Sequence, residues 1–209
     1  MARRDTKCVN SWSKRRWVAF FAALIGFSAL PVPAYAHEAS ATGGFVSGLL
    51  HPVSGLDHVL AMVAVGLWGA QLGMPSMLRL PVAFPMVMAV GGFLGLVGLP
   101  IPGVEIGIAV SAIILGAMVL TEARPPPAVA LAWVAVFAVF HGHAHGTELG
   151  AHDNAVLYSL GFVISTGLLH AAGIALGLVH RWRAGRVALR AAGLVVLAGG
   201  MFFLWSHLR

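Results

Sequence analysis

Two short segments of this 209-residue chain concentrate side chains that can bind a metal ion. All seven are histidines or carboxylates: His51, Asp57 and His58 in the first segment, and His141, His143, His145 and Glu148 in the second. Imidazole nitrogens and carboxylate oxygens, without sulfur, suit borderline divalent ions such as Ni²⁺, Co²⁺, Zn²⁺ and Cu²⁺. The residue types therefore indicate a site for a divalent transition metal.

Helical periodicity places three of the four donors of the second segment on one face. At about 100° per residue, His141, His145 and Glu148 share a stripe about 60° wide. His143 falls about 200° from His141, so it faces away from the stripe unless the helix unwinds at the glycines beside it. We therefore expect a site built from the stripe, which His143 joins only if the helix unwinds.

The first segment has a less regular backbone. His51 and His58 are seven residues apart, a spacing that puts both on one face of a helix. Pro52 lacks a backbone N–H and Gly55 permits distortion, so the direction of Asp57 stays open. The alternative to a ligand role is a packed, hydrogen-bonded core histidine. That alternative explains a single residue more readily than seven donors in two segments.

The chain as a whole has the composition of a membrane protein. Hydrophobic residue types make up 59% of it and charged types only 10%, whereas a soluble surface needs about 25–35% charged side chains. In a membrane helix an Asp costs about 3 kcal/mol, while a Leu or Ile contributes only about 0.5 kcal/mol. A carboxylate in such a place usually faces a cavity, pairs with another group, or binds an ion.

Residues 1–36 have the pattern of a secretory signal peptide. A basic stretch precedes an apolar run, and a small-x-small cleavage box ends at Ala36. We expect cleavage after Ala36, with an uncleaved anchor as the alternative. Six of the 13 basic residues and the only cysteine, Cys8, lie in this segment. The net charge of +6 therefore does not indicate nucleic-acid binding, and the mature chain has only nitrogen and oxygen donors for a metal.

Residues 37–209 predict an all-α, polytopic membrane domain. Six apolar stretches are each long enough to cross about 30 Å of hydrocarbon. We place these helices at 44–71, 80–99, 104–122, 127–148, 154–179 and 186–207. With the mature N-terminus outside, six of the seven arginines of this domain lie on the inner side, as the positive-inside rule requires. We expect a multi-pass protein of the bacterial inner membrane with both mature termini in the periplasm.

This topology brings the two metal-binding segments to the same level of the membrane. The first helix runs inward and carries its donors early, whereas the fourth runs outward and carries its donors late. Both groups of donors therefore belong to the outer half of the membrane, where two antiparallel helices could share one site.

The two segments are similar to those of the HupE/UreJ family of permeases for nickel and, in some members, cobalt. The first matches the family pattern His-Pro-x-x-Gly-x-Asp-His, and the second matches Phe-His-Gly-x-Ala-His-Gly-x-Glu. The resemblance covers essentially the whole chain. It implies Ni²⁺ or Co²⁺ uptake, with the ion as substrate rather than a prosthetic group, and a link to hydrogenase or urease maturation. The candidate metal ligands are His51, Asp57, His58, His141, His145 and Glu148, while the resemblance gives His143 no role.

Two further histidines could bind metal. His170 lies about 24 Å along the fifth helix, one turn after Thr166. It could be a second binding position for the metal, part of a proton relay, or a core hydrogen-bonding group. His37 becomes the N-terminal residue after cleavage, and its α-amine and imidazole could chelate an ion. Glu105 is expected to be solvated or interfacial, and Asp153 is expected to cap the fifth helix.

Three classes of function fit these observations. The first is a metal permease in the lipid bilayer that uses no ATP, since the chain lacks a Gly-x-x-x-x-Gly-Lys-Ser/Thr loop. A homo-oligomer is compatible with it. The alternative is a membrane-embedded zinc hydrolase with Asp57 or Glu148 as base, and the third is a metal-sensing or assembly partner of a metalloenzyme. We predict the permease rather than an enzyme, because the sequence shows no clear substrate groove.

Overall fold

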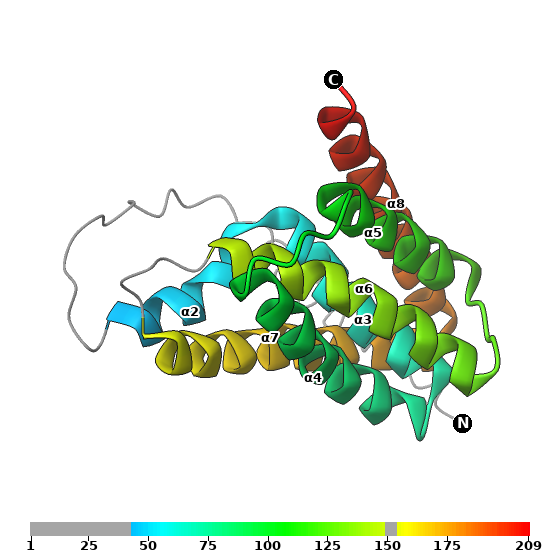
Figure 1. The fold of residues 1–209 in the computed structure, drawn as a ribbon. Coiled ribbons are helices and arrows are strands. Elements are labelled where there is room, and N and C mark those ends of the chain that lie inside the picture. Colours follow the sequence, from blue (N-terminus) through cyan, green and yellow to red (C-terminus); the bar gives the residue numbers. More distant parts are fainter. Residues whose placement is uncertain (1–42, 149–153) are drawn as a thin grey trace, which may run out of the picture. The chain divides into compact units, whose positions relative to one another are not determined.

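The computed structural model of the protein describes residues 43–148 and 154–209, and these fold into helices with no strand among them (Figure 1). The helices are α2 (Gly43–Ser54), α3 (Leu56–Leu72), α4 (Ser76–Leu96), α5 (Val104–Thr121), α6 (Pro127–Glu148), α7 (Ala155–Gly177), the short 3₁₀ helix η1 (Leu178–Arg181) and α8 (Arg183–His207). The predicted all-α class is confirmed. The predicted signal peptide, His37 and Asp153 lie outside the described residues.

Five of these helices are long and apolar enough to cross a membrane, namely α4, α5, α6, α7 with η1, and α8. The pair α2 and α3 passes the same test only when the two are taken together. The protein is therefore a multi-pass helical membrane protein. The observed ends of α4 to α8 lie within four residues of the predicted ones.

The prediction of one continuous helix over residues 44–71 is wrong. The chain bends by 80° between α2 and α3, and Gly55 at the bend has an extended backbone with φ −98° and ψ 116°. Pro52, three residues earlier, has no N–H to donate, which weakens the end of α2. His51 and His58 therefore belong to two helices instead of one face of a single helix.

Glycines bring the backbones of neighbouring helices into contact. Helix α4 lies beside α6, and α5 lies beside α8 (Figure 1). A Cβ added to Gly142 would collide with the carbonyl oxygen of Met88, and one added to Gly146 would collide with that of Gly92. Because each of these two α6 glycines directly follows a candidate ligand, its contact with α4 sets the direction in which that histidine points. Helix packing is thus part of how the site is built.

We expect Gly142→Leu to lower the stability of the folded protein by about 2–3 kcal/mol, because the added side chain must push α6 away from α4. The measurement is unfolding in mild detergent, followed by circular dichroism. Gly167→Leu is the matched control, since Gly167 on α7 is exposed and a Cβ added there would meet no atom of the described residues within 4 Å. Equal stability of the two variants would contradict the packing role of Gly142.

Candidate metal site

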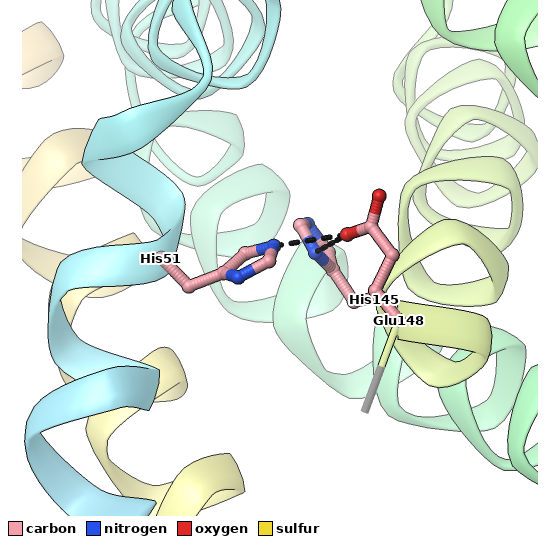
Figure 2. A group of neighbouring side chains, drawn as sticks. All are labelled: His51, His145 and Glu148. Atoms are coloured by element: carbon pink, nitrogen blue, oxygen red, sulfur yellow. Dashed lines mark hydrogen bonds and ion pairs between the residues drawn. The ribbon is translucent and has the colours of Figure 1, made fainter. Parts of the chain in front are cut away.

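Three donors from two helices meet beside a solvent-open cavity at one end of the helix bundle. We call this end the entrance. The Nε2 atom of His51 on α2 lies 3.1 Å from Oε2 of Glu148 at the end of α6. The Nδ1 atom of His145, one turn earlier on α6, lies 3.7 Å from the same oxygen. Figure 2 shows His51 pointing across from α2 toward the other two side chains. One donor atom from each lies within 4.8 Å of the others, a spacing that a single metal ion can bridge with small side-chain movements.

Two more histidines continue this group into the protein. The ring of His58 on α3 lies 4.3 Å from that of His145 and 5.0 Å from that of His141, between ring centroids. The side chain of His51 is 28% exposed, that of His145 6% and that of His58 12%. His141, at the other end, is fully buried. The four imidazoles therefore form a row, which we call the histidine row, from the surface to the interior.

The two inner members of the histidine row are held in the tautomer that a metal requires. Nδ1 of His141 donates to the carbonyl oxygen of Phe137 at 2.9 Å, and Nδ1 of His58 donates to Oδ1 of Asp57 at 3.1 Å. In both rings the remaining Nε2 is buried and has no hydrogen-bond partner in the part of the chain that the structure describes. A hydrogen-bond acceptor beside one ring nitrogen keeps the proton there and leaves the lone pair of the other nitrogen free to coordinate a metal.

Asp57 contacts His58 twice. Its Oδ1 accepts from the backbone N–H of His58 at 2.9 Å as well as from the ring. This arrangement needs a residue without a side chain at position 55, because a Cβ on Gly55 would lie 2.8 Å from that same oxygen. Asp57 was predicted as a ligand, and the structure shows its carboxylate paired with the candidate ligand His58.

His143 lies apart from the histidine row. Helix α6 continues without a break through its two glycines to Glu148, so His143 keeps the opposite face, as the periodicity predicted. Its Nε2 donates to the carbonyl oxygen of Leu99 in the turn between α4 and α5 at 2.7 Å. This contact gives His143 a structural role in holding that turn against α6.

The entrance also contains Glu105, which was expected to be solvated or interfacial and is indeed 53% exposed, but which was not among the candidate ligands. Glu105, in the first turn of α5, lines a cavity of about 250 Å³ together with His51, Asp57, His58 and Glu148. Three carboxylates at one opening attract cations. The signal that could have identified Glu105 was its place inside an apolar run that starts a membrane helix.

Comparison with known proteins shows the family of this chain. The profile of the "HupE / UreJ protein" family matches residues 23–203 of the chain. The chain belongs to the HupE/UreJ family. It is also 46% identical over 172 residues to a protein named HupE from Rhizobium leguminosarum bv. viciae, which covers 82% of this chain and 90% of that relative. No solved structure gives a significant match.

The two HupE/UreJ segments recognised in the sequence lie on α2–α3 and on α6, and these are the elements that meet at the entrance. His170, the deeper candidate, is on α7 and is 1% exposed. Among the described residues, no ring contact joins His170 to the histidine row. Instead its ring packs against Phe84 of α4, which also packs against His141.

Proposed function

We propose that this protein carries a divalent transition-metal ion, Ni²⁺ first and Co²⁺ as the second candidate, inward across the bacterial inner membrane. The observation that supports this most strongly is the histidine row. It begins at a solvent-open group of His51, His145 and Glu148 and continues to the fully buried His141. A resident structural site would be closed around four ligands. A row of nitrogen donors that leads inward instead offers successive positions to a moving ion.

The direction of transport is inferred from charge distribution. We count the bent pair α2–α3 as one span, which gives six spans with both mature termini in the periplasm. In this orientation the entrance group faces the periplasm, and the arginines between spans face the cytoplasm. An inside-negative potential of 100 mV contributes about 4.6 kcal/mol to the entry of a divalent ion. That is enough for roughly a thousandfold accumulation without ATP hydrolysis.

The donor set fits a transported ion better than a catalytic one. Transport requires ligands that replace the hydration water of the ion and yet release it, and imidazole with carboxylate meets this need more readily than thiolates. The family match gives no support to the zinc hydrolase considered above. A metalloenzyme that needs nickel, such as hydrogenase or urease, would be the consumer of the imported ion.

Purified protein in liposomes should take up radioactive Ni²⁺ with saturation kinetics, and an inside-negative potential should accelerate the uptake. Unlabelled Co²⁺ should compete more strongly than Mg²⁺, because nitrogen donors discriminate against hard cations. Empty liposomes are the control for leakage. Tight binding of Ni²⁺ without any flux would contradict the permease and favour the metal-sensing role.

A further inference from the structure

A second group of unpaired polar side chains lies deeper in the bundle than the histidine row. His170 and Thr166 are one turn apart on α7 and are 1% and 0% exposed. Among residues 43–148 and 154–209, the two ring nitrogens of His170 and the hydroxyl of Thr166 have no partner with hydrogen-bonding geometry. Buried polar atoms are normally paired, so two unpaired side chains on one face require an explanation.

The face of α7 that carries this pair is continuous with the entrance. Tyr158, Phe162, Thr166 and His170 follow one another at intervals of four residues, and all are buried. The ring of Phe162 lies 4.3 Å from that of His145. His170 is therefore about 12 Å further along the helix axis than the level of His145.

One aromatic ring connects the two groups. The ring centroid of Phe84 on α4 lies 5.5 Å from that of His141 and 5.4 Å from that of His170. Phe84 is itself fully buried. The innermost ring of the histidine row and the ring of His170 thus share a single apolar neighbour, whose rotation is a small movement compared with a shift of helices.

The backbone of α4 supplies His170 with a candidate acceptor. The carbonyl group of Pro81 interacts with the His170 ring, although the contact falls short of a hydrogen bond. Pro85, four residues later, has no N–H and cannot satisfy that carbonyl within the helix. If one ring nitrogen of His170 donates to Pro81, the other presents a lone pair, as in His141 and His58.

We propose that His170, assisted by the hydroxyl of Thr166, is an inner binding position that receives the divalent ion from His141. The proposal rests on the proposed transport function. An ion that leaves the row of imidazoles loses its ligands unless another donor is within reach, and His170 is the buried donor beyond Phe84. Division of the path into two weak positions lets the ion advance without being held too tightly at either.

Direct coordination can be tested by spectroscopy with Co²⁺. The chain has a single cysteine, Cys8, so Cys8→Ser provides a thiol-free background in which His170→Cys introduces one buried thiol. Titration with Co²⁺ should produce the near-ultraviolet charge-transfer band of a thiolate bound to Co²⁺. Ser165→Cys in the same background is the matched control, because Ser165 is buried next to Thr166 on another face of α7, and it should produce no such band.

Transport measurements separate this proposal from the function on which it rests. We expect His170→Ala to reduce the initial rate of Ni²⁺ uptake by at least about tenfold while Ni²⁺ binding at the entrance stays within about twofold of wild type. Ser165→Ala should transport normally. Uptake by His170→Ala within about twofold of wild type would overturn the proposal, as would a His170→Cys protein that binds Co²⁺ without the thiolate band. Absence of uptake by the wild type would instead contradict the permease function itself.

Discussion

His145→Ala should reduce Ni²⁺ uptake by more than about 100-fold, whereas His143→Ala should leave it within about twofold of wild type. His145 has buried ring nitrogens within the entrance group, next to Glu148 and to the ring of His58. His143 is equally buried but faces the other side of α6 and donates to Leu99. The two histidines are two residues apart on one helix, so they match in depth and differ in direction.

The comparison requires equal amounts of inserted protein. His143→Ala removes the part-buried hydrogen bond to the carbonyl oxygen of Leu99, which costs about 0.5–1.5 kcal/mol of stability and could lower the yield. Rates should therefore be divided by the amount of folded protein in the liposomes. His143→Gln, whose amide can still donate, should restore the yield. If His143→Ala impairs transport per molecule as much as His145→Ala does, α6 must unwind around its glycines. The prediction that the site is formed by one face of a regular helix would then be wrong.

Asp57→Asn should reduce Ni²⁺ uptake by about 10–100-fold while the protein still inserts and purifies normally. The amide oxygen of Asn can accept the two hydrogen bonds that Asp57 accepts from His58, so the local geometry is retained. What disappears is the negative charge beside His58, which stabilises an incoming divalent cation and makes the imidazole a better donor. Wild-type uptake by Asp57→Asn would show that Asp57 acts only as a structural hydrogen-bonding group.

A double-mutant cycle distinguishes the two ways in which Asp57 could act. If Asp57 works through His58, then Asp57→Asn combined with His58→Ala should be no worse than His58→Ala alone. If Asp57 coordinates the ion itself, the losses should be closer to additive. Ni²⁺ affinity, measured by calorimetry in detergent, provides the readout without depending on the transport rate.

The helical class of this protein and the faces on which its candidate ligands lie could be predicted from the sequence alone. An apolar composition with few charges requires membrane helices, because backbone groups in lipid must pair within a helix. The period of 3.6 residues correctly put His141, His145 and Glu148 on one face of α6 and His143 on the other. Nitrogen and oxygen donors in such helices predict a site for a divalent metal, and the family expected from the two segments is confirmed by the match over residues 23–203.

Tertiary structure decided how the donors meet. The bend of 80° at Gly55 separates His51 from His58, and no periodicity within one helix can describe a site that spans a bend. The contact of His51 on α2 with Glu148 on α6 joins residues 97 positions apart. Glu105 at the entrance and His170 behind Phe84 are likewise products of packing between helices. Sequence periodicity defines the faces of a helix, whereas the side chains and glycines of its neighbours determine which faces come together.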